Sequence, residues 1–170
     1  MPTAHKPITP RTDLILLDTG VLITYARRGE PAQRLEQIVA LQSGKTEAVV
    51  SIISIAEALS FARKRGWSVR NQDALKELIQ SRLVPIDINR PEILDAYVDI
   101  DHYSEKVCKP ARSMGNQQND LWIAATARVL NCTLVTMDKD FDHLHGTMIH
   151  RNFIAQERLK PSGPSDGKKS

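Results

Sequence analysis

The chain has 170 residues, of which 41% are hydrophobic and 25% charged, so one globular domain with a packed core is expected. The net charge of +3 allows a nucleic-acid partner but does not require one. The two cysteines, Cys108 and Cys132, form no C-x-x-C pair, which argues against a zinc site or a disulfide framework and favours two reduced thiols.

The chain divides into three predicted segments. Residues 1–12 contain three prolines and no long apolar run, so we expect a flexible lead-in and not a secretory signal peptide. Residues 13–155 are expected to form the domain, and residues 156–170 a disordered tail. The first apolar run, 14–17, is too short to cross a membrane, and nothing marks export, so a cytoplasmic protein is expected.

Short apolar runs alternate with helical patterns along the chain. Four runs are predicted strands, at 14–17, 48–50, 83–86 and 133–136, with a weaker fifth at 147–150. The predicted helices are 21–28, 32–41, 52–65 (ending at Gly66), 74–81, 91–107 and 121–130. Because strands that alternate with helices pair in parallel, this order predicts an α/β protein with a parallel sheet.

Two aspartates follow predicted strands. Asp18 comes directly after the first strand, and Asp138 comes one residue after the strand at 133–136. Active sites of open parallel sheets form outside the carboxyl ends of the strands, so both acids are expected at the same edge. Taken alone, each acid is better explained as the cap of the next helix.

Two further acids lie at helical positions. Glu57 has mostly apolar neighbours in the helix after the second strand, but periodicity does not settle which face it occupies. Asp120 opens an apolar helix, where the helix dipole favours an acid. A capping role explains either Asn119 or Asp120, but not obviously both.

Four carboxylates at one sheet edge would repel one another unless a cation neutralised them. Ligand sets made only of oxygen suit Mg²⁺ or Mn²⁺ better than zinc. Such a cation polarises a phosphodiester and activates water.

Each of these acids lies in a short motif, and the four motifs are Leu16-Leu17-Asp18-Thr19, Ser54-Ile55-Ala56-Glu57, Asn119-Asp120-Leu121-Trp122 and Val135-Thr136-Met137-Asp138. In kind and order, over residues 13–155, they resemble the motifs of PIN-domain ribonucleases, and in particular of the VapC toxins of VapBC toxin–antitoxin pairs. The resemblance implies a three-layer α/β/α PIN-like fold with a central, mainly parallel sheet of four to five strands.

The resemblance also implies a function and a site. The chain would be a Mg²⁺- or Mn²⁺-dependent endoribonuclease that pairs with an antitoxin protein and forms a homodimer. Asp18 and Asp120 would be the main metal ligands, and Glu57 and Asp138 would complete the acidic site. Thr136, and in a similar way Thr19, would brace it by hydrogen bonding.

Two departures affect these assignments. Many relatives have Asn or Ser where this chain has Gly20, which removes a polar contact near Asp18. Asp140 and Asp142 lie close to Asp138, so either one could assist or replace it.

Three other functions are alternatives for a chain with this pattern. A haloacid-dehalogenase phosphatase needs a second Asp two residues after the first, where this chain has Gly20. A phosphate-receiver domain needs an early acidic cluster and a late Lys in an order that is absent here. A PIN fold that only binds RNA or protein remains the alternative to an enzyme.

Several residues have an ordinary explanation that we favour. Trp122 is expected in the core and Trp67 near the surface, where it is a weak candidate for an RNA contact. His143 and His145 are expected to be surface residues. Solvated charge is the first interpretation of the basic residues, which together could also hold a phosphate backbone: Arg27, Arg28, Arg63, Lys64, Arg65, Lys109 and Arg112.

Overall fold

A computed structural model describes residues 9–107 and 118–160 of the chain. The strands are β1 (Arg11–Leu17), β2 (Glu47–Ser51), β3 (Val84–Ile86), β4 (Cys132–Thr136) and β5 (His150–Phe153). The helices are α1 (Thr19–Arg27), α2 (Gly29–Val39), α3 (Ile52–Lys64), α4 (Val69–Arg82), α5 (Pro91–Val107) and α6 (Gln118–Leu130). Short 3₁₀ helices follow α2, β4 and β5 (Leu41–Ser43, Lys139–Leu144 and Gln156–Leu159). No helix among these residues is long and apolar enough to span a membrane.

The five strands form one parallel sheet in the order β3-β2-β1-β4-β5, which confirms the predicted fold class. The central strand β1 is covered on both faces, and Leu16 and Leu17, whose side chains point to opposite faces, are both fully buried. This double burial explains why the run is continuously apolar instead of alternating.

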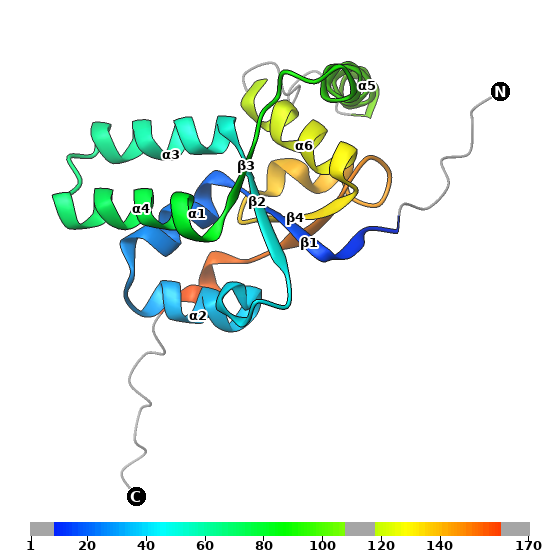
Figure 1. The fold of residues 1–170 in the computed structure, drawn as a ribbon. Helices are drawn as coiled ribbons and strands as arrows, with labels where there is room; N and C mark the ends of the chain where they lie inside the picture. The colour runs from blue at the N-terminus through cyan, green and yellow to red at the C-terminus, as the bar shows by residue number, and fades with distance from the viewer. Residues whose placement is uncertain (1–8, 108–117, 161–170) are drawn as a thin grey trace, which may run out of the picture.

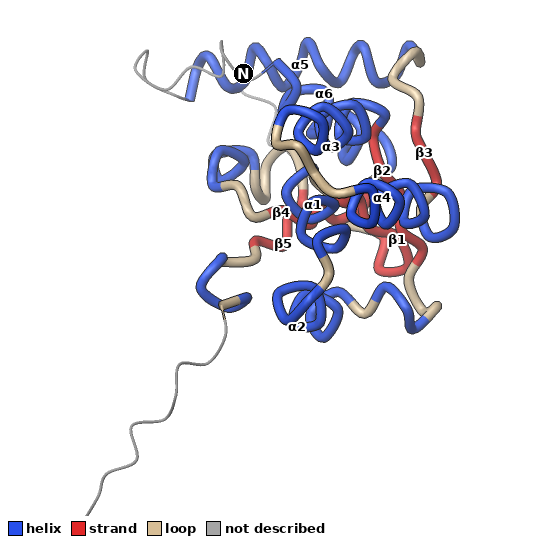
Figure 2. Tube along the Cα trace, turned by 90° about the vertical axis from the view of Figure 1, so that its left-hand side faces the viewer, coloured by secondary structure: helices blue, strands red, loops and turns tan. Residues whose placement is uncertain are grey.

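Helices cover both faces of the sheet, so the molecule has three layers (Figures 1 and 2). Helices α5 and α6 pack together on one face, where Ile100 and Ile123 join Leu16 in one apolar cluster. Helices α1, α2 and α4 supply the opposite cluster, which includes Leu22 and Leu75.

Local signals set both ends of α3, a helix near the future site. Ser51 caps α3, with its hydroxyl accepting a hydrogen bond from the Ile53 amide at 3.3 Å. Gly66 follows the end of the same helix with φ +60°, a left-handed conformation that glycine adopts without steric cost. The end of this helix at Gly66 was predicted from the sequence.

The fifth strand lies three residues later than predicted. Residues 147–150 carry the apolar side chains of Met148 and Ile149, but most of this segment forms a turn in which the Gly146 amide donates to the Ile149 carbonyl at 2.9 Å. Both apolar side chains are buried against the α5–α6 face, and β5 follows at His150–Phe153. The apolar residues Met148 and Ile149 therefore indicated burial correctly, but they did not indicate where the strand lies.

The segment boundaries also shift. Strand β1 already begins at Arg11, inside the predicted lead-in. Residues Gln156–Leu159 form a 3₁₀ helix, and Leu159 is buried in the core although a disordered tail was predicted from residue 156. The rest of the predicted lead-in and tail, residues 1–8 and 161–170, lies outside the described residues.

Candidate active site at the carboxyl edge of the sheet

Asp18 lies at the end of β1, next to the end of β4. The pairing of Leu17 with Val135 places Asp18 beside Thr136 across the two strands. One Asp18 oxygen, Oδ1, accepts from the Thr19 amide at 2.7 Å and so caps α1. The other, Oδ2, accepts from the Thr136 hydroxyl at 2.6 Å. Asp18 therefore caps α1 and also lies at the sheet edge, as the sequence predicted.

Asp18 is buried, and this changes its ionisation. Burial raises the pKa of its carboxyl from 3.8 to about 6, although the hydrogen bonds from Thr136 and Thr19 oppose the shift. The neighbouring charges of Asp138 and Glu57 raise the pKa further. Two hydrogen bonds thus orient the Asp18 carboxyl, whereas burial and repulsion from other acids both disfavour its charged form.

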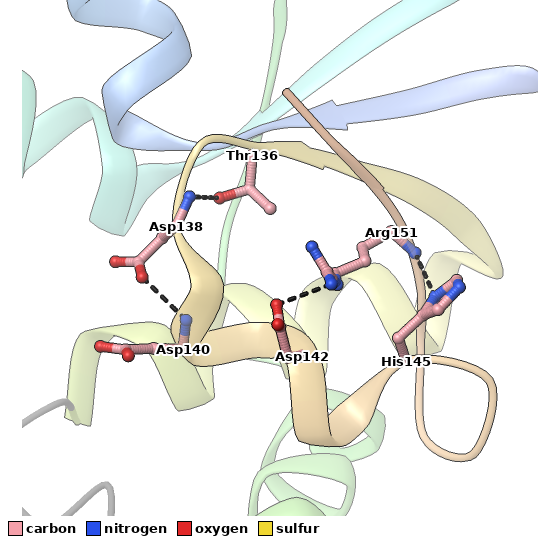
Figure 3. A network of polar contacts seen from close by, with 6 residues as sticks. All are labelled: Thr136, Asp138, Asp140, Asp142, His145 and Arg151. Carbon is pink, nitrogen blue, oxygen red and sulfur yellow. Dashed lines mark hydrogen bonds and ion pairs between the residues drawn. The ribbon is translucent and has the colours of Figure 1, made fainter. Parts of the chain in front are cut away.

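Thr136 connects two of the predicted acids. Its hydroxyl accepts from the Asp138 amide at 2.9 Å, as Figure 3 shows. The same hydroxyl donates to Asp18, so Thr136 holds the loop after β4 against β1. Asp138 in turn caps the following 3₁₀ helix by accepting from the Asp140 amide at 2.8 Å. The bracing contact expected of Thr136 is confirmed.

Glu57 links three helices. Its Oε2 accepts from the Thr19 hydroxyl of α1 at 2.6 Å, and its Oε1 accepts from the Asn119 amide of α6 at 2.7 Å. The half-buried side chain therefore faces the same site as Asp18, which the helical periodicity had left open. In the sequence, Asn119 was interpreted as a cap and as part of the third motif, with no role of its own in the site. Its position just before Asp120 was the available signal for such a role.

Asp120 lies in the first turn of α6 and is half-buried. Burial raises the pKa of its carboxyl to about 7, and the charges of Asp18, Asp138, Glu57 and Asp140 add to the shift. The other three acids predicted from the sequence, Asp18, Glu57 and Asp138, therefore lie close enough to Asp120 for their charges to raise its pKa.

A fifth acid, Asp140, joins the cluster. Carboxylate oxygens of Asp120, Asp138 and Asp140 lie within 4.8 Å of one another. Asp142 points elsewhere, because its Oδ1 pairs with the Arg151 guanidinium at 2.6 Å (Figure 3). Of the two extra acids noted in the sequence, Asp140 and not Asp142 therefore lies in the site.

The donor set fits a hard divalent cation. The gathered groups are carboxylates, which are the ligands that Mg²⁺ and Mn²⁺ prefer, and their mutual repulsion is what a cation would relieve. Cys132 is a buried free thiol, and burial raises its pKa to about 12, which does not favour a thiolate ligand. Cys108 lies outside the described residues.

The histidines contact other groups. His145 is exposed, as predicted, and its Nδ1 accepts from the Arg151 amide at 3.1 Å. The prediction of a surface position was wrong for His143, which is half-buried with its Nε2 2.9 Å from the Ser104 hydroxyl of α5. A helix packed over it, invisible in the local sequence, explains the difference.

The two tryptophans also differ in setting. Trp122 packs against the α5–α6 cluster, and the centres of its ring and the Tyr97 ring are 4.2 Å apart, in agreement with the predicted core position. Trp67 is partly buried against the Phe61 ring, 6.0 Å away in an edge-on contact. The Arg27 guanidinium lies 5.4 Å from the centre of the Trp67 ring, so an aromatic and basic cluster forms at the end of α3.

A protein-family model described as PIN domain matches residues 15–146. The chain belongs to the PIN domain family. This membership agrees with the four motifs and does not support the phosphatase or receiver-domain alternatives.

Solved structures share this PIN fold. VapBC2 from Rickettsia felis, solved with a promoter DNA fragment, has a TM-score of 0.63 and 21% identity, with 81% of this chain and 98% of that chain covered. VapBC-1 from nontypeable Haemophilus influenzae has a TM-score of 0.60 and 26% identity, with 82% and 97% covered. VapC20 from Mycobacterium tuberculosis, a sarcin-ricin loop cleaving toxin, has a TM-score of 0.56 and 12% identity, with 80% and 98% covered. A comparison with curated protein sequences found no match.

Proposed function

We propose that this PIN domain is a Mg²⁺- or Mn²⁺-dependent endoribonuclease and the toxin of a toxin–antitoxin pair. The observation that carries the proposal is the gathering of Asp18, Glu57, Asp120 and Asp138 at one sheet edge, where burial and mutual repulsion raise the pKa values of Asp18 and Asp120. Acids held in this way favour an active site over a fold that only binds RNA or protein, which is the alternative function.

The same residues would hold the cation. Asp18 and Asp120 are the proposed main ligands, Glu57 and Asp138 complete the set, and Asp140 is added because its carboxylate lies beside those of Asp120 and Asp138. When bound, a divalent cation stabilises charge that develops on a phosphoryl group and makes water more acidic.

The protein's own groups suggest the type of reaction. The described part of the site contains no Cys and no Ser–His pair that would act as a covalent nucleophile. We therefore propose that water adds to the phosphorus atom while the bond to the 3′-oxygen breaks. The 3′-oxygen leaves as a hydroxyl after taking a proton, and the other fragment keeps a 5′-phosphate.

The relatives support a proposal about the partners. Structures with the same fold are VapBC toxin–antitoxin proteins, so we propose a separate antitoxin chain, part of which lies across the acidic site. A homodimer and a cytoplasmic location belong to the same proposal.

The function is tested by incubating the full chain with a synthetic single-stranded RNA and Mg²⁺ or Mn²⁺. We expect cleavage that EDTA abolishes, with 5′-phosphate ends. Asp120→Asn should lower the rate by at least about a hundredfold, because losing one ligand weakens both binding of the cation and its position. Asp73→Asn, an exposed acid on α4, is the matched control and should cleave like the parent. Products with 2′,3′-cyclic phosphates, or parental activity in Asp120→Asn, would refute the mechanism.

Cation binding is measured separately by calorimetry with Mn²⁺. Asp18→Asn and Asp120→Asn should each weaken the affinity by at least about tenfold, while Asp73→Asn should not change it. Unchanged affinity in both site variants would show that the acids are not ligands.

A further inference from the structure

A groove between α1 and α3 begins at the acidic site. It has a volume of about 550 Å³, which is in the range of pockets that hold small ligands. Thr19, Glu57 and Asn119 line one end, and these are the three residues that the hydrogen bonds of Glu57 tie together. Any chain that passes through the groove would therefore lead directly to the acids.

The chemistry of the groove changes along α3. Ile23 of α1 and Ala56 and Phe61 of α3 give the groove apolar groups, and on α3 Phe61 and the exposed Ser60 lie between Glu57 and Lys64. The far end of the groove is lined by Lys64, seven residues after Glu57 and so about 10 Å further along the helix. The groove therefore changes from a carboxylate at the Glu57 end, through apolar groups, to an ammonium group at the Lys64 end.

More positive charge surrounds the Lys64 end. The Arg27 and Arg65 guanidinium groups lie 5.6 Å and 5.5 Å from the centre of the Phe61 ring. Both arginines are exposed, so their charges remain available to an anion in solvent. An anionic group is thus attracted to this end of the groove and repelled from the Glu57 end.

We infer that this groove binds a nucleotide of the RNA strand next to the bond that is cut. The base lies on the apolar middle, where an aromatic and aliphatic surface accepts any base without hydrogen-bond readout. The phosphate of that nucleotide contacts Lys64. A single RNA strand has this alternation of flat apolar groups and anions, and the shared residues at Glu57 set its distance from the acids.

The inference rests on the proposed ribonuclease function, and Lys64→Ala tests its charged end. Steady-state cleavage of the synthetic RNA should show a KM raised about fivefold with kcat nearly unchanged, as expected for one lost phosphate contact. RNA affinity, measured by fluorescence anisotropy, should become less dependent on salt, with the slope of log K against log salt reduced by about 0.7. Arg63→Ala removes the same charge from the neighbouring position, which does not line the groove, and should leave both KM and slope close to the parent.

Ser60→Trp tests the apolar middle by filling it from an exposed helix position. We expect RNA affinity to fall at least tenfold while Mn²⁺ affinity and the melting temperature stay at the parental values. Arg63→Trp is the control for bulk on the same helix. Parental RNA affinity and KM in both Lys64→Ala and Ser60→Trp would overturn the inference, including the case in which these variants lose only binding of a protein partner.

The two proposals fail in different ways. If the parent binds RNA through Lys64 and Ser60 but cleaves none with Mg²⁺ or Mn²⁺, the groove assignment stands and the ribonuclease function is wrong. If the parent cleaves RNA and the variants cleave it equally well, the function stands and the groove assignment is wrong. A parent that neither binds nor cleaves RNA would refute both.

Discussion

At the scale of single residues, the site depends on polar groups that are not acids. The hydroxyls of Thr19 and Thr136 and the amide of Asn119 each donate to a carboxylate at 2.6 to 2.7 Å. Such charge-assisted hydrogen bonds fix the direction of each carboxylate and lower the free-energy cost of burying its charge. The same hydrogen bonds therefore orient these carboxylates and favour their charged form.

Thr136→Val should damage the site without changing any acid. Valine has almost the same shape but neither donates to Asp18 nor accepts from the Asp138 amide, so a buried carboxylate loses a donor. We expect the free energy of unfolding to fall by roughly 1–3 kcal/mol and the pKa of Asp18 to rise further. Urea denaturation and Mn²⁺ calorimetry near pH 6.5 measure the two effects.

Two variants control for this change. Thr133→Val lies on the same strand away from the acids and should leave Mn²⁺ affinity unchanged, and Thr136→Ser should restore it. Equal affinity in Thr136→Val and the parent would show that the hydroxyl does not support cation binding.

At the scale of elements, two glycines, one in α1 and one after α3, differ in backbone conformation. Gly66 ends α3 with φ +60°, whereas Gly20 lies within α1, and no atom lies within 4 Å of where a side-chain carbon would be at either position. The two glycines therefore differ in backbone conformation and not in available space.

Gly66→Ala and Gly20→Ala should change stability in opposite directions. Alanine at Gly66 must adopt a left-handed conformation, so the free energy of unfolding should fall by about 1 kcal/mol. Alanine at Gly20 favours the helix and should raise it by up to about 1 kcal/mol. Thermal melting of both variants is sufficient, and a Gly66→Ala variant as stable as Gly20→Ala would contradict the assigned backbone conformation.

At the scale of the whole molecule, the acids make stability depend on pH. The carboxyls of Asp18 and Asp120 have pKa values of about 6 and about 7 in the folded chain, above their ordinary value of 3.8. The folded state therefore binds these protons more tightly than the unfolded state between about pH 4 and 7. In this window, stability must fall as the pH rises, and the contribution levels off above both folded pKa values.

We expect the free energy of unfolding in EDTA to fall by on the order of 2 kcal/mol between pH 5 and pH 8, a value reduced for solvent at the half-buried Asp120 and for coupling between the acids. Saturating Mn²⁺ should remove most of the fall, and Asp120→Asn should reduce it. Urea denaturation at the two pH values gives the result, and equal or rising stability toward pH 8 would contradict the assigned pKa values.

Self-association is also expected at this scale. Leu94 and Val98 lie one turn apart on α5 and are 46% and 64% exposed, which leaves apolar surface that association could cover. Light scattering should give the mass of a homodimer at micromolar concentration. A monomer at high micromolar concentration, with no partner co-purifying, would count against both the homodimer and the antitoxin.

The sequence by itself determined the elements and the acids. Apolar runs and helical periodicity report burial directly, so the four main strands and the helices of the described residues were predicted to within three residues of their bounds, except that α4 begins at Val69, five residues before the predicted start at 74. Four ordered motifs indicated the family. Asp18 and Asp138 were predicted to meet because parallel strands end at one edge, and the charge of Asp138 does contribute to the raised pKa of Asp18.

Only the tertiary structure decided which neighbours these acids have. The orientation of Glu57, the role of Asn119 and the choice of Asp140 over Asp142 depend on contacts between residues far apart in the chain, such as Arg151 pairing with Asp142. The groove to Lys64 likewise exists only where α1 packs against α3. Local patterns encode burial and backbone conformation, but the direction of a polar side chain is set by whichever partner packing brings within hydrogen-bond distance.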